Sequence, residues 1–451
     1  MQERERELLL LLKWRDSKML LTGRQLRAVF QHFCPFDSEG NLVEANSRVT
    51  LLASNVNLPV EVQARAFAMA AAAGEQSPML VQLSFNSAET IGNDPARIRP
   101  LPGITVQQTE AAVVAGARQA VKLIDSYAAA YGAKYLAVAL DHFQVPKYDE
   151  SKELAESQGE TLAMQLAAAR IRHAMQYMKP VFGCEIDISD DTFARYLDYL
   201  VSPAYVKFRR DFLGVVQAVS PAWGMIDTEK LPPILDFVVT REIVEGVRHV
   251  VGNEEMMVEA EFGATGQSGQ ALEYRKLTGA ALERFAEQVC CFIRYTGADG
   301  IAYPIGMEHA AKKDVKHEPD RERLQVVQRA LFLACGRYIP FAQHGGTGAA
   351  SVERGLVGKN NINTHYLVAG ANSLADHVAS HMDGIRAGDK KYCGSGLFTK
   401  MIQVEAEAAL AKLMETGSVN TGPALAAVLN QLPKHTEAAS GLVTELDPYA
   451  E

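Results

Sequence analysis

The sequence predicts an α/β fold, a (β/α)8 TIM barrel with a helical insertion after strand 3 and a helical C-terminal extension. Short apolar runs alternate with alanine-rich amphipathic stretches, which is typical of a parallel sheet with helical crossovers. Eight such runs occur, and several are apolar throughout, as strands covered on both faces should be. The 451 residues would allow two or three domains, but single barrels with insertions also reach this length. An open parallel sheet built from the same units is the alternative.

The predicted strands and helices follow one another along the chain. The strands are residues 50–54, 79–84, 135–140, 223–227, 256–261, 300–305, 339–343 and 360–364. The helices between them are residues 60–73, 110–131, 240–251, 277–295 and 321–335. Gly132, Gly252 and Gly336 follow three of these helices, where glycine commonly ends a helix in the left-handed conformation.

Three regions lie outside the repeat. Residues 1–49 are expected to form an N-terminal helical segment, and residues 383–451 a C-terminal helical extension. Residues 50–382 form the predicted catalytic barrel domain, which includes an insertion at 143–222. This insertion is too long for one crossover helix, and we interpret it as a subdomain or lid. It contains two predicted helices and a possible ninth strand, at residues 160–179, 190–200 and 181–188.

Composition limits the classes of partner. The net charge is −9 and the pI about 5.7, so the chain lacks the electrostatic footprint of a nucleic-acid-binding protein. Its six cysteines form no CxxC pair, which favours a reducing cytoplasm. The leucine run at residues 8–12 is too short to span a bilayer, and its flanks do not resemble a signal peptide. We therefore expect a cytoplasmic protein without membrane or nucleic-acid partners.

Each predicted strand ends in or leads to a polar group, and the site of such a barrel lies at the carboxyl ends of its strands. The residues concerned are Asn55, Asn57, Ser84, Asp141, His142, Asp227, Glu259, Glu261, His309, Lys312, Lys313, His344, Asn361, Asn363 and Thr364. A single histidine is more often a surface or hydrogen-bonded core residue. Three histidines at strand ends instead predict a catalytic zinc site with three protein ligands and one open position.

A glycine-rich loop follows His344. The residues Gly345, Gly346, Thr347 and Gly348 come directly after an apolar run at 338–342. Glycine has no Cβ, so the backbone N–H groups of such a loop can close around an anion, and Thr347 adds a hydroxyl donor.

Several of these polar residues also have a purely structural interpretation. Glu259 and Glu261 are spaced by two and so lie on one face of their strand; for Glu259 we expect hydrogen bonds to backbone amides at the barrel rim. Ser84 could cap a turn, and Asp227 could be the partner of a neighbouring histidine or lysine. Lys312 and Lys313 could form a solvated patch.

Taken together, the motifs resemble the class II, zinc-dependent fructose-bisphosphate aldolase family over residues 50–365. They occur in the family's order: Asn55-Val-Asn57, Val81-Gln-Leu-Ser84, Leu140-Asp-His142, Met225-Ile-Asp227, Val258-Glu-Ala-Glu261-Phe-Gly263, His309-Ala-Ala-Lys-Lys313, His344-Gly-Gly-Thr-Gly348 and Lys359-Asn-Asn-Ile-Asn-Thr364.

The resemblance implies roles for these residues. His142, His309 and His344 would bind Zn²⁺ or another divalent metal, Asp141 would be the general acid/base, and Glu261 the carboxylate near the metal. Substrate and its phosphate would be held by Asn55, Ser84, Lys313, Gly345, Gly346, Thr347, Asn361, Asn363 and Thr364. A monovalent cation is also possible.

The resemblance also implies an activity and an assembly. The chain would be a lyase of carbohydrate metabolism, such as glycolysis. By default it would cleave fructose 1,6-bisphosphate to dihydroxyacetone phosphate and glyceraldehyde 3-phosphate. We expect a homodimer or homotetramer, for which the helical tail offers a surface.

The departures from the family pattern leave alternatives open. The segment from Ala264 to Gln270 lacks the acidic loop that supplies a base in many members, Ala310 replaces a glycine, and the stretch from His344 to Asn361 is short. The substrate could instead be tagatose bisphosphate or another ketose phosphate. A metal-dependent sugar epimerase or isomerase, and a non-catalytic barrel subunit, also remain open.

The residues allow a metal-assisted mechanism. Zinc can polarise the ketone and stabilise an ene-diolate as a Lewis acid, while Asp141 takes the hydroxyl proton. Glu273, or a water held by Gln267 or Gln270, would then protonate the enolate. A Schiff-base route would need a lysine inside the barrel, and none of the predicted strands has one in its middle.

Overall fold

A closed barrel of eight parallel strands forms the centre of the molecule. The computed structural model describes residues 19–151, 161–263, 277–306 and 318–433. The strands pair in chain order, and β8 closes the ring by pairing with β1. They are β1 (Leu51–Asn55), β2 (Met79–Ser84), β3 (Leu136–Gln144), β4 (Trp223–Asp227), β5 (Met257–Glu261), β6 (Gly300–Ala302), β7 (Phe341–Gln343) and β8 (Val357–Ile362). The predicted (β/α)8 barrel is confirmed, and the open sheet is excluded.

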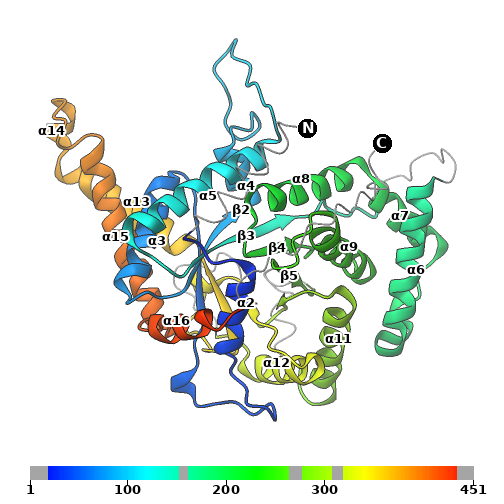
Figure 1. Ribbon diagram of the computed structural model, residues 1–451. Helices are drawn as coiled ribbons and strands as arrows, with labels where there is room; N and C mark the ends of the chain where they lie inside the picture. Colours follow the sequence, from blue (N-terminus) through cyan, green and yellow to red (C-terminus); the bar gives the residue numbers. More distant parts are fainter. Residues whose placement is uncertain (1–18, 152–160, 264–276, 307–317, 434–451) are drawn as a thin grey trace.

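Helices surround the barrel, as the alternating pattern predicts (Figure 1). The crossover helices are α3 (Val60–Ala73), α4 (Phe85–Ile91), α5 (Ala112–Tyr131), α8 (Pro203–Val219), α9 (Pro233–Glu245), α11 (Ala280–Thr296) and α12 (Arg321–Cys335). A π-helical turn, Gly246–Val250, extends α9. Gly132 and Gly336 end α5 and α12 with φ of 69° and 64°, as expected for left-handed glycine caps. Alanines on α3 lie buried against the core, because their small side chains let the helix approach the sheet closely.

The N-terminal segment closes the amino end of the barrel. Its helix α2 (Gly23–His32) begins at a capping box on Thr22. The Leu21 amide donates to the Leu136 carbonyl at 2.7 Å, at the start of β3. Phe30 packs on Trp223, at the start of β4, with ring centroids 5.3 Å apart. The carboxyl ends of the strands are therefore left for the site.

The insertion after β3 is helical and packs on the outer layer. It contains α6 (Leu162–Phe182), η2 (Gly183–Ile186), α7 (Asp190–Val201) and the crossover helix α8. The predicted ninth strand at 181–188 is wrong, because these residues span the end of α6 and η2. A short apolar run does not distinguish a strand from a buried helix end. Helix α6 packs against α9 and α11, so the described part of the insertion covers the flank of the barrel.

The C-terminal helices form a projecting arm and a second part that packs on other helices of the molecule. Helices α13 (Thr364–Ser380), α14 (Met382–Arg386) and the first part of α15 (Ser395–Thr416) project from the barrel on the side opposite α6 and α7 (Figure 1). The rest of α15 packs on α3, and α16 (Gly422–Asn430) packs on α2. Among the described helices, none combines the length and apolar character that crossing a membrane requires.

Candidate metal centre

A β-bulge at the end of β3 points two consecutive side chains into one site. The chain advances three residues from Leu140 to Phe143 while β4 advances two, from Gly224 to Ile226. His142 takes up the extra residue with a left-handed φ of 46°. Consecutive strand residues normally face opposite sides, so the bulge explains how Asp141 and His142 both reach the site. A strained backbone of this kind is common at functional sites.

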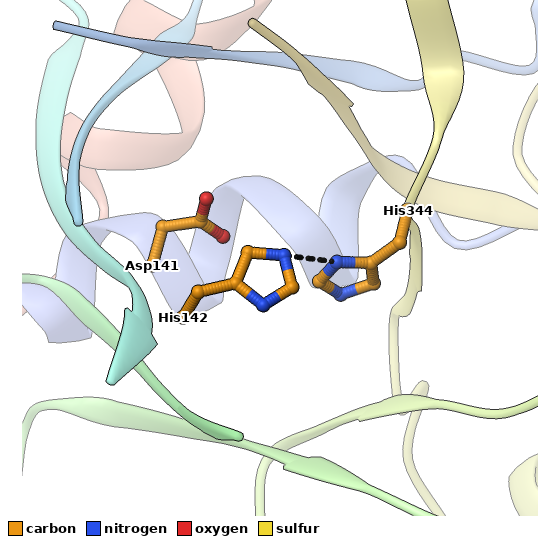
Figure 2. A group of neighbouring side chains, drawn as sticks. All are labelled: Asp141, His142 and His344. Carbon is orange, nitrogen blue, oxygen red and sulfur yellow. Dashed lines mark hydrogen bonds between the residues drawn. The ribbon is translucent and has the colours of Figure 1, made fainter. Parts of the chain in front are cut away.

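His142 and His344 face one another across the carboxyl end of the barrel. His344 follows β7, and its Nδ1 lies 3.0 Å from His142 Nε2 (Figure 2). The two rings meet edge to face at 73°. Ligand atoms of Asp141, His142 and His344 all lie within 4.8 Å of one another. Nitrogens about 2.0–2.1 Å from a tetrahedral zinc stand about 3.3 Å apart, so these side chains fit a metal ion after a small separation of the rings.

The second nitrogen of each histidine contacts a carboxylate. His142 Nδ1 lies 3.1 Å from Asp227 Oδ2, and His344 Nε2 lies 3.0 Å from Glu259 Oε1. A carboxylate at one ring nitrogen holds the proton there, so that the lone pair of the opposite nitrogen is directed toward a metal. The interpretation of Asp227 as the partner of a neighbouring histidine is thus confirmed.

The expectation that Glu259 bonds backbone amides at the rim is wrong. Its carboxylate is fully buried and contacts three side chains. Besides His344, these are Trp223, whose Nε1 donates to Oε2 at 2.6 Å, and Lys359, whose Nζ lies 2.6 Å from Oε2. Spacing along β5 showed which face Glu259 occupies but not which strands supply its partners.

The expectation that no strand has a lysine in its middle is also wrong, because of Lys359. Strand β8 begins at Val357, earlier than predicted, so a lysine does lie in the middle of a strand. Its side chain is fully buried, paired with Glu259, and its Nζ lies 5.1 Å from the centroid of the Trp223 ring. A Schiff base requires an accessible, unprotonated amine. Lys359 is not accessible in this arrangement, so its presence does not supply the missing nucleophile.

The electrostatics of the site favour a cation. Burial alone would raise the pKa of Glu259, but the charge of Lys359 and the hydrogen bond from His344 lower it to about 2. Burial opposes a charge on His142, yet the carboxylates of Asp141 and Asp227 raise its pKa to about 9. Without a metal, the His142 ring thus carries a proton between the carboxylates of Asp141 and Asp227. A divalent ion bound there would displace that proton.

Asp141 is enclosed by three amide groups. Asn55 Nδ2 donates to its Oδ2 at 2.7 Å, while Gln82 Nε2 and Asn361 Nδ2 donate to Oδ1 at 3.2 and 3.3 Å. Burial raises the pKa of Asp141, but the charges of His142 and Lys359 outweigh it and hold the pKa below its usual value. The side chain is therefore a fixed carboxylate, in a form that can accept a proton.

Gln82 is a site residue that the sequence prediction missed. It lies in the middle of β2, whose bounds were predicted correctly, and it is fully buried. The available signal was a polar residue within an apolar strand. Asn55 and Asn361, predicted to bind substrate, lie on Asp141 in this structure.

A second polar network lines the mouth beside Asp141. Asn57 Nδ2 donates to Asn363 Oδ1 at 2.9 Å, and Ser87 Oγ donates to Asn57 Oδ1 at 3.4 Å. Ser84 is the N-cap of α4 and accepts from the Ser87 amide at 3.1 Å, which confirms its interpretation as a cap. The network joins the ends of β1, β2 and β8.

The glycine-rich loop needs glycine at two positions. Gly345 has a left-handed φ of 68°, and a Cβ on Gly346 would lie 2.2 Å from Asn360 Oδ1. Gly346–Gly348 then form a 3-10 turn in which Thr347 is half-buried. Thr364, the first residue of α13, is exposed. Loop and helix start follow neighbouring strands, so their N–H groups lie at the same end of the barrel.

Other predicted residues are placed as follows. Glu261 is buried in β5, and the described group of potential metal ligands does not include it. Residues outside the described part of the chain are His309, Lys312, Lys313, Gln267, Gln270 and Glu273.

Fold and site together define the class of protein. A closed parallel barrel that gathers histidines and carboxylates at the carboxyl ends of its strands is an enzyme scaffold with a candidate metal centre. Residues 219–420 match the family model described as fructose-bisphosphate aldolase class-II. This match covers a little under half of the chain, and it supports an enzyme of the lyase class that is similar to the class II fructose-bisphosphate aldolases.

One solved structure supports the same fold at low sequence identity. The fructose-bisphosphate aldolase of Campylobacter jejuni is 16% identical, with 89% of this chain and 96% of that chain covered and a TM-score of 0.54. A structure described as a candidate fructose-1,6-biphosphate aldolase from Coccidioides immitis is 15% identical, covers 83% and 93%, and has a TM-score of 0.45. At 16% identity, the match to the first structure shows only that the two chains share a fold. Comparison with curated proteins gives no match.

Proposed function

We propose that this chain is a metal-dependent aldolase that cleaves or forms the carbon–carbon bond of a phosphorylated ketose. The observation that carries the proposal is the pair His142 and His344, with facing nitrogens 3.0 Å apart beside the carboxylate of Asp141. Breaking a β-hydroxy ketone requires a group that withdraws electrons at the ketone and a base at the hydroxyl. The centre offers a place for both.

His142 and His344 would hold the metal, together with His309 by family resemblance. A bound Zn²⁺ would polarise the substrate carbonyl as a Lewis acid. Asp141 would take the proton of the hydroxyl group next to the bond that breaks, and Asn55 would keep its carboxylate oriented. Glu261 is proposed as a further carboxylate near the reacting atoms.

The proposed substrate is fructose 1,6-bisphosphate, with dihydroxyacetone phosphate and glyceraldehyde 3-phosphate as products. The glycine-rich loop after β7 and the start of α13 supply N–H groups suited to one phosphate. Thr347 and Thr364 would add hydroxyl donors, and Ser84, Asn363 and Lys313 would contact the rest of the substrate. Tagatose bisphosphate, which differs in configuration at one carbon, is the proposed alternative.

The test is a triose-release assay on the full chain, reconstituted with zinc. Fructose 1,6-bisphosphate and tagatose 1,6-bisphosphate are compared, each with and without a chelator. In parallel samples, borohydride is added with the substrate to trap any Schiff base. We expect triose release that the chelator abolishes, and no covalent adduct after reduction. Trapping of an adduct would assign a Schiff-base enzyme instead. Interconversion of ketoses without triose would indicate an epimerase or isomerase, and zinc binding without turnover of either sugar would indicate a non-catalytic subunit.

We further propose that the chain assembles into a homodimer or homotetramer through its helical arm. Exposed apolar side chains lie on the arm: Leu367 and Val368 on α13, Met382 on α14 and Phe398 on α15. Solvent-exposed apolar groups gathered on one projecting element favour association. Sedimentation of the chain and of the double variant Val368→Asp, Phe398→Asp tests this: the wild type should be oligomeric and the variant a monomer.

A reducing compartment such as the cytoplasm is the proposed location. All six cysteines are free thiols, and burial raises the pKa of the Cys290 and Cys291 thiols to about 12 and about 11. Localisation of a tagged chain tests the proposal directly.

A further inference from the structure

A buried ion pair lies directly beneath the candidate metal centre. Lys359 Nζ and Trp223 Nε1 both approach Glu259 Oε2, each at 2.6 Å. The other oxygen, Oε1, is left to accept from His344 Nε2 at 3.0 Å. Two donors on one oxygen fix the carboxylate with its second oxygen directed at the histidine.

Trp223 is packed closely between its neighbours. A Cβ on Gly300 would lie 2.4 Å from the indole Cη2, so the ring lies tightly against β6. Phe30 packs on the ring at 5.3 Å between centroids, and the Lys359 ammonium lies 5.1 Å from the ring centroid. Trp223 therefore interacts with both members of the ion pair.

Stability alone does not account for a charged pair in the barrel interior. Well-packed apolar side chains in place of a buried ion pair are often equally stable or more so. Among the described residues, the lysine, the tryptophan and the histidine come from three different strands or strand ends and meet on this one carboxylate. The arrangement instead fixes the orientation of the Glu259 carboxylate.

We propose that Lys359 and Trp223 are positioning residues that determine which ring nitrogen of His344 faces the metal. With Glu259 Oε1 held at Nε2, the proton of the neutral ring lies on Nε2, and the lone pair on Nδ1 faces His142 Nε2. If the carboxylate turns away, the ring can carry its proton on Nδ1, where it blocks the metal. The inference rests on the proposed function, because it assumes that His142 and His344 bind a metal ion.

The experiment measures zinc affinity directly, by competition with a chromophoric chelator on the full chain. The variants are Lys359→Met, which removes the ammonium and keeps the stem, and Trp223→Phe, which removes the N–H donor and keeps an aromatic ring. Arg209→Met is the control, since it breaks a buried ion pair with Glu242 on the outer helical layer. Thermal midpoints and the visible spectrum of the cobalt-loaded chain are recorded for each protein.

We expect zinc affinity to fall about 10–100-fold in Lys359→Met, as is usual when the partner of a metal ligand is disturbed. Trp223→Phe should lose less, in the same direction, and both should change the cobalt spectrum. Arg209→Met should lose thermal stability and keep the wild-type zinc affinity, which separates positioning from general destabilisation.

Wild-type zinc affinity and an unchanged cobalt spectrum in folded Lys359→Met would overturn the inference and leave the proposed function standing. If Lys359→Met does not fold, Trp223→Phe decides in the same way, because it leaves the ion pair in place. Failure of the wild-type chain to bind zinc would overturn the proposed function, and the inference with it.

Discussion

Two buried carboxyl groups at the barrel mouth and two in the outer helical layer have pKa shifts in opposite directions. At the mouth, Glu259 and Asp141 are almost fully buried, yet the pKa of each is lowered. In the outer layer, Asp236 on α9 and Glu405 on α15 are buried to a similar degree, and the pKa of each is raised, that of Glu405 to about 7. Desolvation is the largest cause in all four cases, and it always raises the pKa of a carboxyl group.

The partners of each group make the difference. Lys359 and His344 contact Glu259, and three amides enclose Asp141. Asp236 accepts a hydroxyl hydrogen bond from Thr240, and at Glu405 a side-chain hydrogen bond with Gln63 lowers the pKa by less than burial raises it. The mouth is thus built to keep negative charge in a dry place, where it attracts a cation. At Asp236 and Glu405 only side-chain hydrogen bonds offset the effect of burial, so the pKa of each carboxyl group is raised.

The largest effect should come from removing a metal ligand at the mouth. His344→Ala deletes one ligand and leaves Glu259 Oε1 without its hydrogen-bond donor, so bound zinc should be lost and triose release should fall at least ~10³-fold. Metal analysis and a triose assay measure this. His249→Ala changes an exposed histidine outside the site and should alter neither quantity. Full zinc content in His344→Ala would remove the mouth from consideration as the metal centre.

The same substitution in the two regions should have different consequences for catalysis. Asp141→Asn keeps the shape but cannot take a proton, so kcat should fall about 10²–10⁴-fold. Asp236→Asn should leave kcat unchanged, because burial raises the pKa of this carboxyl group and it is not among the residues of the site. Steady-state kinetics at matched zinc content test the pair, and equal losses in both variants would contradict the proposed role of Asp141.

Neutralising a paired carboxylate should destabilise the fold. Glu259→Gln leaves the ammonium of Lys359 buried without its counter-charge, a loss of about 3–5 kcal/mol in the free energy of unfolding. Urea unfolding of the metal-free chain measures it, so that metal binding does not contribute. A loss below about 1 kcal/mol would show that Lys359 finds another partner or loses its charge at little cost.

Glu405 in the outer helical layer should make the folded chain less stable as the pH rises. The pKa of Glu405 rises from its ordinary value of 4.5 to about 7 in the folded chain. Between these pH values the folded chain keeps a proton that the unfolded chain has lost. Its contribution to stability is therefore complete below pH 4.5 and is lost as the pH rises through 7. The full loss is at most about 3 kcal/mol.

Glu405→Gln tests this pH dependence, because the amide does not titrate. Urea unfolding at pH 5 and pH 8 should show that the variant is less sensitive to pH than the wild type and relatively more stable at pH 8. Parallel pH dependence of the two proteins would mean that the carboxyl group is hydrated or paired when the chain is folded.

The elements that were predicted well are those with local signals. The bounds of β2, β4, α3 and α12 match the prediction residue for residue, because each is a continuous apolar or amphipathic run between polar or glycine boundaries. Strand β8 was predicted too late because Lys359 and Gly358 interrupt its apolar pattern. A buried lysine cannot be recognised from its own segment, since its counter-ion Glu259 lies about a hundred residues earlier in the chain.

The residues of the site divide in the same way, into those with a local sequence signal and those whose partners come from distant strands. His142, His344 and Asp141 were found because polar residues at strand ends of a barrel converge, and Asp227 was interpreted correctly as a histidine partner. Gln82 was missed, and Glu259 was given the wrong partners. In both cases the function of the side chain depends on which strand lies opposite, and a single segment carries no information about that.

By itself, the sequence determined the barrel, the order of its strands and the end at which its polar groups gather, because hydrophobic periodicity and strand-end polarity are written into consecutive residues. Only the tertiary structure decided which buried groups carry charge. Whether a carboxyl group in a dry interior keeps its proton depends on the donors and cations that distant strands bring within about 3 Å of it.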